Sequence, residues 1–308
     1  MTPIVTIIIC TYNRGFLIKE TLPTLFNQDI DSNLFDIIIV DNNSDDDTSM
    51  ILKDFQNQYS NLKIIKETNQ GLSHAKNAGM VASNTDWIVY LDDDAKVPMD
   101  FVPKVLSNIE NSNYSCFGGV YLPWYKFGKP KWFRDKYASN KNELVTFCTL
   151  DKEFASGGIM AIKRNLLLKY DGFSTDIGMK GNNTAYGEET LLQIKLRKDG
   201  YQIGYDPNWI MYHVVSDYKL SPWWFLKSGY HSGKDFWTIY EKEPSFKLII
   251  KYIYRALKYL FINIFKYTPN IFNNNYYIQN WIIDTLRPFS IKFGQIIGGF
   301  RFIYSPND

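Results

Sequence analysis

The sequence has few cysteines and few histidines. Its 308 residues include three cysteines, Cys10, Cys116 and Cys148, without CxxC spacing, and three histidines. An odd and widely spaced set of cysteines argues against a disulfide framework and against a zinc site of paired cysteines. We therefore expect three small buried thiols in a protein that stays in a reducing compartment.

Two further signals are missing near the amino terminus. Residues 1–10 are apolar but have neither the basic segment nor the small-residue cleavage site of a secretory signal peptide. The residues that follow contain neither GxGxxG nor GxxxxGKS/T, the motifs of the common Rossmann and P-loop phosphate sites. We interpret residues 4–10 as the first β-strand of a cytoplasmic protein that handles phosphate charge by other means.

The apolar content is high enough, at 45%, for a substantial core. The net charge of +2 hides an asymmetry along the chain. Residues 246–308 contain eight Lys and Arg and two acids, a balance of +6, so residues 1–245 carry −4. We expect one large domain at residues 1–220 and a helical region at residues 221–308 whose charge suits an anionic surface.

Apolar runs of strand length alternate with helical patterns in the first third of the chain. Strands are expected at residues 4–10, 35–40, 62–66 and 87–91, and helical stretches lie between them. This alternation predicts βαβ units and an α/β fold with a mostly parallel sheet. Ligands bind such sheets at the carboxyl ends of the strands, where residues 11–14, Asp41 and residues 92–94 fall.

Three consecutive acids, Asp92, Asp93 and Asp94, directly follow the strand expected at residues 87–91. Neighbouring carboxylates raise one another's pKa and repel, so a cation among them explains the run best. Mg²⁺ and similar hard ions bind one or two carboxylates together with substrate phosphates, which favours a metal-diphosphate site. The alternative is a solvated acidic turn in which one Asp caps the next helix.

A second acidic pair, Glu188 and Glu189, follows Gly187 and precedes a helical pattern. Acids at a helix start are ordinarily explained by the helix dipole. Two adjacent acids in the half of the domain opposite the metal site are also what a general base would look like. His213 ends an apolar run and is either structural or a ligand for a metal or a diphosphate oxygen.

These motifs occur in the order seen in family 2 glycosyltransferases, so the chain resembles this family from about residue 4 to residue 215. The motifs are residues 11–14, 40–46, 69–77, 91–94, 157–158 and 187–189, and His213. Each motif is weak alone, but seven in this order are specific for the superfamily. The resemblance implies the GT-A fold, a Rossmann-like central sheet with flanking helices, and an enzyme of the type that makes bacterial polysaccharides or lipid-linked glycans.

The resemblance also implies roles for single residues. In the implied nucleotide-binding half, residues 1–98, the donor contacts are Thr11, Tyr12, Arg14, Asp41, Asn69, Gly71, Lys76, Asp92 and Asp93. Asp41 is expected to bind the base, and Lys76 stands where the family often has Arg, which keeps a cation but weakens a bidentate contact. The implied metal ligands for Mn²⁺ or Mg²⁺ are Asp94, Asp92 and His213. In the acceptor-binding half, residues 99–220, the implied base is Glu189 or Glu188, where the family more often has Glu-Asp.

The implied reaction inverts the anomeric carbon. A carboxylate deprotonates a hydroxyl of a glycan or polyprenyl-linked acceptor, which then attacks a nucleotide-sugar, expected to be a UDP-sugar. Two alternatives are a nucleotidyltransferase or sugar-nucleotide pyrophosphorylase, for which a basic glycine-rich loop is missing, and a non-catalytic glycan-binding protein, which would not need both acidic sites. Nucleic-acid binding is not expected, because the basic residues lie among long aliphatic side chains.

The segment at residues 246–266 has the pattern of an amphipathic helix without acids. Its cations follow one another at steps of four, four, three and eight and are Lys247, Lys251, Arg255, Lys258 and Lys266. So many charges argue against a membrane span. We expect the helix to lie in an anionic membrane interface at the inner face of the cell membrane; the alternative is packing on the catalytic domain with solvated cations. The apolar runs at residues 276–283 and 291–302 are expected to form a second interfacial hairpin.

Overall fold

The computed structural model describes residues 2–180 and 185–304, which form two compact units. The first, called the sheet unit here, comprises Met1–Trp124, Ala138–Gly181 and Glu188–Val214. The second, called the helical unit, comprises Tyr125–Tyr137, Asn182–Gly187 and Val215–Asp308. The chain passes between the two more than once, so neither unit is one continuous stretch of sequence.

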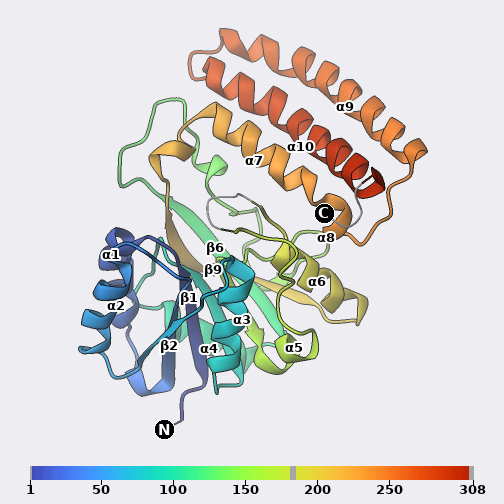
Figure 1. The fold of residues 1–308 in the computed structure, drawn as a ribbon. Coiled ribbons are helices and arrows are strands. Elements are labelled where there is room, and N and C mark those ends of the chain that lie inside the picture. The colour runs from blue at the N-terminus through green and yellow to red at the C-terminus, as the bar shows by residue number, and fades with distance from the viewer. Residues whose placement is uncertain (1, 181–184, 305–308) are drawn as a thin grey trace. The chain divides into compact units, whose positions relative to one another are not determined.

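The sheet unit is built on a single sheet with nine strands among the described residues (Figure 1). The strands are β1 (Val5–Thr11), β2 (Phe35–Asp41), β3 (Leu62–Lys66), β4 (Trp87–Asp92), β5 (Ala95–Lys96), β6 (Cys116–Trp124), β7 (Cys148–Thr149), β8 (Ile159–Lys163) and β9 (Ile203–Val214). Their order is β3-β2-β1-β4-β8-β6-β9-β5, and β7 pairs with β9. The first four strands run parallel, β8 is antiparallel to both of its neighbours, and β9 is parallel to β6.

Helices cover both faces of this sheet. They are α1 (Gly15–Phe26), α2 (Thr48–Gln56), α3 (Leu72–Ala82), α4 (Phe101–Asn111), α5 (Arg164–Lys169) and α6 (Glu188–Lys198), with 3-10 turns η1 (Ser32–Leu34) and η2 (Asp135–Tyr137), the latter in the helical unit. Side chains of α1, α2 and α4 share one core with Val5, Ile7 and Ile9 of β1. Side chains of α3, α5 and α6 share a second core with Ile8. Successive side chains of β1 point to opposite faces of the sheet and enter two different cores. Both faces of the strand are buried, which explains why β1 is apolar along most of its length.

The structure confirms the α/β fold with a mostly parallel sheet, and every expected strand in the first third of the chain is present within one residue of its expected bounds. In the later part of the chain, residues 203–214 form a single strand, β9, whose register against β6 shifts between Gly118 and Val120. Such an irregularity interrupts the pattern in sequence without ending the strand. The three cysteines are free thiols, of which Cys116 is buried and Cys10 and Cys148 are half-buried.

The helical unit contains three long helices, α7 (Pro222–Lys234), α9 (Phe246–Tyr267) and α10 (Ile278–Tyr304), with α8 (Phe236–Ile239), η3 (Asp217–Lys219) and η4 (Thr268–Phe272) between them. Helix α10 packs against both α7 and α9, so it is the middle helix of the three (Figure 1). The expected second hairpin is therefore wrong. Residues 278–304 form one helix that includes most of the first run and all of the second. It continues through Pro288, because packing along two neighbouring helices compensates for the hydrogen bond that proline removes.

Glycines allow α7 and α10 to approach closely. A Cβ atom added at Gly294 would meet the carbonyl oxygen of Tyr230, and one added at Gly298 would meet the carbonyl oxygen of Lys234. Trp237 connects α8 to α10, because its Nε1 donates to the carbonyl oxygen of Gln295 at 2.6 Å. Within the described part of the chain, no helix is both long enough and apolar enough to cross a membrane.

Candidate functional site

The carboxyl ends of neighbouring parallel strands meet at one edge of the sheet unit. Cys10 on β1 is in register with Asp92 on β4, and Thr11 is in register with Asp41 on β2. The four side chains come from three strands that are adjacent in the sheet. The expectation that these strand ends lie together is confirmed.

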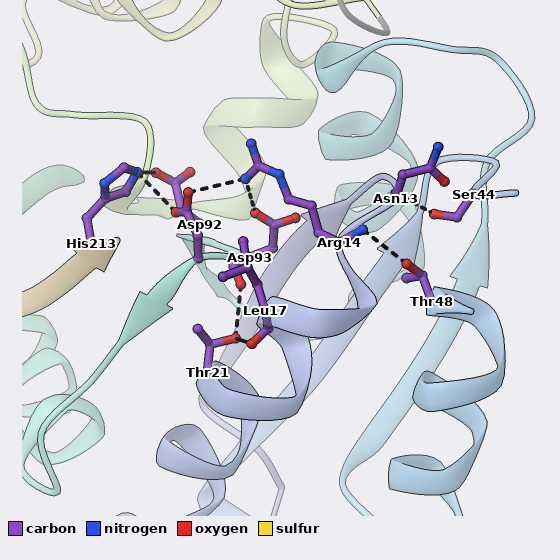
Figure 2. Close-up of polar contacts among 10 residues, drawn as sticks. Asn13, Arg14, Leu17, Thr21, Ser44, Thr48, Asp92, Asp93 and His213 are labelled. Carbon is purple, nitrogen blue, oxygen red and sulfur yellow. Dashed lines mark hydrogen bonds and ion pairs between the residues drawn. The ribbon is translucent and has the colours of Figure 1, made fainter. Parts of the chain in front are cut away.

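Asp92, Asp94 and His213 form a cluster that could hold a metal ion. Each offers one ligand atom, and these atoms lie within 4.8 Å of one another. His213 reaches the acidic turn because β5 pairs with β9, which places it opposite Ala95. Its Nε2 atom is 3.0 Å from Oδ1 of Asp94 and 3.8 Å from Oδ2 of Asp92 (Figure 2). Carboxylates suit hard divalent ions and an imidazole adds a common metal ligand, so this donor set fits a divalent cation.

Arg14 lies on the opposite side of the acidic turn from His213 (Figure 2). Its Nη1 atom is 2.6 Å from Oδ1 of Asp93 and 3.2 Å from Oδ2 of Asp94. Burial raises the pKa of Asp93; the Arg14 charge opposes this and the Asp94 charge adds to it. Thr21 on α1 donates to the carbonyl oxygen of Asp93 at 2.9 Å, so the first helix fixes the turn. Arg14 thus supplies positive charge to the acids from a second direction.

The first turn is fastened to the turn that follows β2. Asn13 has φ +52°, and its Nδ2 donates to Oδ1 of Asp45 at 2.6 Å. Its backbone N–H donates to Ser44 Oγ at 3.0 Å (Figure 2). Asn tolerates this left-handed conformation better than most residues. The predicted contact residues Thr11, Tyr12 and Arg14 are therefore held on a turn that is tied to the strand end at Asp41.

Asp41 is buried at the end of β2 and helps to shape its own loop. Its Oδ1 atom accepts a hydrogen bond from the Ser44 backbone N–H at 2.9 Å, and the Ser49 hydroxyl donates to Oδ2. Each carboxylate oxygen has two lone pairs, so both can still accept from a ligand. Asp41 can therefore still accept a hydrogen bond, as the predicted contact with the nucleotide base requires.

The neighbouring residue Asn42 was assigned no role by the sequence, yet it organises the next loop. Its Nδ2 donates to the carbonyl oxygens of Glu67 at 3.1 Å and Asn69 at 2.8 Å, and its Oδ1 accepts from the Gly71 N–H at 2.8 Å. Gly71 has φ +147°, a conformation that suits glycine. Asn42 therefore connects the predicted contacts Asn69 and Gly71 to the end of β2. The sequence signal that could have indicated this role is the position of Asn42 directly after Asp41, at the end of an expected strand.

Lys76 is directed to the acidic pair. Its Nζ atom lies 2.9 Å from Oε1 of Glu188, and both side chains are almost fully buried. Burial alone would raise the pKa of Glu188, but the charge and hydrogen bond of Lys76, together with hydrogen bonds from the backbone and from Glu189, lower the pKa overall. Lys76, expected to contact the donor, is thus in direct contact with a residue of the acceptor half.

Glu189 has the opposite electrostatics. Its Oε2 atom is shielded from solvent and has no hydrogen-bond partner among the described residues. Burial, and then the charge of Glu188, raise the pKa of Glu189 to about 7, although Lys76 opposes the shift. A carboxylate with a pKa near neutrality is suited to take up and release a proton at physiological pH.

Two consecutive glycines lie against the two acidic sites. A Cβ atom added at Gly157 would be 2.9 Å from Oε1 of Glu189, and one added at Gly158 would meet the Asp92 carboxylate. The two glycines immediately precede β8, which is paired with β4. The metal cluster and the Glu189 carboxylate therefore adjoin the same short piece of backbone.

The family follows from a comparison with known sequences. The model described as "Glycosyl transferase family 2" matches residues 6–171, more than half of the chain. The chain belongs to glycosyltransferase family 2. The match includes the strand ends and the acidic turn but stops before Glu188, Glu189 and His213.

Relatives of this glycosyltransferase include two proteins of Haloferax volcanii. "Glycosyltransferase AglE" is 30% identical over 75% of this chain and 72% of the relative, and "Glucosyl-dolichyl phosphate glucuronosyltransferase" is 21% identical over 77% and 76%. The "GalNAc(5)-diNAcBac-PP-undecaprenol beta-1,3-glucosyltransferase" of Campylobacter jejuni is 26% identical over 64% of this chain and 60% of the relative. These names support a transferase enzyme.

Solved structures show the same fold. "Mannosyltransferase PcManGT from Pyrobaculum calidifontis in complex with GDP-Man and Mn2+" has a TM-score of 0.60 at 17% identity and covers 99% of this chain and 76% of that one. "S. aureus TarS 1-349 in complex with UDP-GlcNAc" has a TM-score of 0.56 at 15% identity and covers 97% and 91%. The predicted family and GT-A fold are thereby confirmed, whereas the roles of single residues stay predictions.

Proposed function

We propose that this family 2 glycosyltransferase moves a sugar from a nucleotide-sugar to an acceptor hydroxyl, with inversion at the anomeric carbon and with Glu189 as the general base. The observation that supports this most is the glycine pair Gly157 and Gly158, which adjoins the Glu189 carboxylate on one side and the Asp92 carboxylate on the other. An enzyme of this kind needs a base and a site for the leaving diphosphate near one another.

Glu189 suits the base better than Glu188 does. Glu188 is committed to Lys76 at 2.9 Å, whereas Oε2 of Glu189 has no partner among the described residues. In the proposed reaction Oε2 accepts the acceptor's hydroxyl proton, the acceptor oxygen bonds to the anomeric carbon, and the bond from that carbon to the diphosphate breaks. A single displacement with one available carboxylate inverts the configuration.

Asp92, Asp94 and His213 would hold a divalent cation, Mn²⁺ or Mg²⁺. A bound cation would supply positive charge for the departing diphosphate. Arg14 orients the acidic turn through Asp93 and adds a cationic side chain at the same edge. The mannosyltransferase structure is a complex with GDP-Man and Mn²⁺, which is consistent with a nucleotide-sugar and a divalent ion in a site of this fold.

The donor is proposed to be a UDP-sugar. The buried carboxylate of Asp41 can accept the N3–H of uracil, and the TarS structure is described as a complex with UDP-GlcNAc. For the acceptor we propose a polyprenyl-linked glycan, because the names of two relatives specify a dolichyl phosphate and an undecaprenol diphosphate. A lipid-linked acceptor requires the enzyme to work at a membrane surface.

Helix α9 has a face that suits such a surface. Its apolar side chains at steps of four, three, four and four are exposed: Phe246, Ile250, Ile253, Leu257 and Phe261. A helix turns about 100° per residue, so these residues form one sector. The buried residues Ile249 and Ala256 lie on another sector, which packs on α10.

The cations of α9 occupy the sector next to the exposed apolar one. Lys247, Lys251, Arg255 and Lys258 are exposed, and the helix contains no acid. Exposed apolar side chains beside a band of cations match an anionic phospholipid surface, where each basic residue contributes about 1 kcal/mol. We therefore propose that α9 holds the enzyme peripherally on the cytoplasmic face of an anionic membrane.

The function is tested by screening nucleotide-sugars for Mn²⁺-dependent turnover and then comparing two variants. Glu189→Gln should lower kcat by about 10²–10⁴-fold while UDP and Mn²⁺ still bind together, because only the proton acceptor is lost. Asp94→Asn should weaken the binding of UDP with Mn²⁺. Calorimetry and initial rates measure the two effects, and circular dichroism controls for folding.

Other outcomes would favour the alternatives. Formation of a nucleotide-sugar from a nucleoside triphosphate and a sugar phosphate would identify a pyrophosphorylase. Glycan binding without turnover of any nucleotide-sugar would identify a binding protein. Full activity of Glu189→Gln would remove the base assignment.

A further inference from the structure

Lys76 sits at a place where the family resemblance implies a contact with the donor, but its surroundings indicate another role. Its side chain is 6% exposed and that of Glu188 is 4% exposed, and the two charged groups are 2.9 Å apart. The Nζ atom also lies 4.9 Å from the ring centre of Phe173. The ammonium group is therefore enclosed by a carboxylate and an aromatic face.

Glu188 is held on its other side as well. A Cβ atom added at Gly178, which has φ +95°, would be 3.0 Å from Oε2 of Glu188 and 3.2 Å from Ser73 Oγ. Glycine at this place leaves room for the carboxylate. Glu188 is the first residue of α6, so the Lys76 contact connects α3 to the start of the helix that carries Glu189.

Several titratable groups lie near Lys76 and Cys10. They are Glu188 and Glu189 from α6, and Asp92 and Asp93 around the end of β4. Arg14 pairs with Asp93, Lys76 pairs with Glu188, and Nε2 of His213 lies 3.8 Å from Oδ2 of Asp92. Two adjacent carboxylates that are both buried and both charged would repel strongly unless a cation neutralised one of them.

We propose that Lys76 is a positioning residue of the acidic pair rather than a donor contact: it fixes Glu188 as its counter-charge and thereby leaves Glu189 oriented and available to receive the acceptor's proton. The inference rests on the proposed function, because it needs Glu189 to be the base. Lys76 acts through Glu188 and does not touch the reacting atoms. Glu188 in turn is a structural partner and not a second base.

The pKa values agree with this division. Lys76 lowers the pKa of both acids, while burial and the Glu188 charge raise the pKa of Glu189 to about 7. Removal of Lys76 should therefore move the pKa of Glu189 upward, because a negative Glu188 would be left without its counter-charge. A base must be deprotonated to act, so the rate near neutral pH should fall and should recover as the pH rises.

The test compares three proteins: the wild type, Lys76→Met, and the double variant Lys76→Met/Glu188→Gln. Donor turnover is measured against pH with saturating acceptor, and the binding of UDP with Mn²⁺ is measured by calorimetry. Lys76→Met should move the acidic limb of the kcat profile upward by about one pH unit, which should lower kcat by about fivefold at pH 7 and by about tenfold at lower pH. UDP binding should change by less than about threefold, since no donor contact is lost.

The double variant decides between positioning and donor binding. Replacement of both partners removes the buried charge as well as its counter-charge, so kcat should return to within about threefold of the wild type. A role in donor binding predicts instead that UDP affinity falls in both variants and that Glu188→Gln rescues nothing, and this result would overturn the proposal. If Lys76→Met does not fold, the double variant alone still decides, because an inactive or weakly binding double variant contradicts the proposal.

A wild-type protein that turns over no nucleotide-sugar and binds no UDP with Mn²⁺ would refute the proposed function. An active wild type whose Lys76→Met variant loses UDP binding at unchanged kcat would refute only the role of Lys76. Lys76→Arg keeps the charge and should retain the pH profile of the wild type more closely than Lys76→Met does.

Discussion

The sheet unit and the helical unit treat apolar surface in opposite ways. In the sheet unit, helices cover both faces of the sheet, so that Ile7 and Ile8 of one strand enter two separate cores. In the helical unit, α9 buries Ile249 and Ala256 among its 22 residues and exposes nine large apolar side chains. Exposed apolar surface of this extent is typical of a site that contacts a membrane or another protein molecule.

Charge is distributed just as differently. The sheet unit collects acids at one edge and pairs them internally, as Arg14 does with Asp93 and Lys76 does with Glu188. Helix α9 carries cations and no acid. Charges that are paired and buried fix the geometry of a site, while unpaired charges of one sign attract a surface from a distance. The contrast fits a division between chemistry in one unit and attachment in the other.

Buried glycines lie against functional carboxylates in the sheet unit and against the backbone of a neighbouring helix in the helical unit. The largest effect is expected for Gly157→Ala and Gly158→Ala, where an added methyl group would meet Glu189 and Asp92 respectively. Gly157→Ala should lower kcat by about 10²–10³-fold with UDP binding retained, because the base is displaced. Gly158→Ala should weaken the binding of UDP with Mn²⁺ by about 10–100-fold, because Asp92 is pushed out of the metal cluster.

Each of these two variants is the control for the other. The two glycines are consecutive in sequence, but an added methyl group would meet a different carboxylate at each. Steady-state kinetics and calorimetry measure the split, and thermal unfolding checks the fold. If both variants lost the same property to the same degree, the two acidic sites would not be separate, and the proposed division between base and metal ligands would be wrong.

The glycines of the helical unit should affect stability instead of catalysis. Gly294→Ala would bring a methyl group against the backbone of Tyr230, and the overpacking should destabilise the helical unit by about 3 kcal/mol. Gly229→Ala is the matched control, because its Cβ atom would be 3.3 Å from side-chain atoms of Arg287 and Ile291 that can adjust. Chemical unfolding monitored by tryptophan fluorescence compares them. Equal stability of the two variants would show that α7 and α10 are not in such close contact.

Much of the sheet unit could be predicted because its strands are short, apolar and interrupted by polar turns. The Asp92–Asp94 triplet stood out since three adjacent acids after an apolar run repel one another unless a cation lies among them, and β4 ends at Asp92. The contact between Lys76 and Glu188 could not be predicted, because the two residues are distant in sequence and only the fold brings them together. Pairing of distant residues is set by topology, which local patterns do not encode.

The carboxy-terminal region was harder to predict for a different reason. A hairpin was expected from the apolar runs at residues 276–283 and 291–302, but α10 continues through Pro288 and packs along both α7 and α9. The helix at residues 246–266 was predicted closely, with α9 ending one residue later. The regular spacing of its cations and apolar residues is a property of neighbouring residues, so it can be recognised in the sequence before the fold is known.

The smallest effect is expected at the proposed membrane face. Lys251→Glu/Lys258→Glu should lower binding to vesicles that contain phosphatidylserine by at least ~30-fold, because each lysine near an anionic surface contributes about 1 kcal/mol. Binding to phosphatidylcholine vesicles should be weak for both proteins, and added salt should reduce the difference between them. Turnover of a water-soluble acceptor should not change, since α9 takes no part in the chemistry.

The control is Lys53→Glu/Lys63→Glu, which reverses two exposed lysines of the sheet unit and so alters net charge equally. It should bind vesicles nearly as the wild type does. Leu257→Ser/Phe261→Ser tests the apolar sector separately and should weaken binding even at high salt, where the cations are screened. If these serine variants instead converted a dimer into a monomer in sedimentation and left vesicle binding intact, the exposed face of α9 would be an interface between two copies, and the contrast between the units would concern assembly rather than membrane attachment.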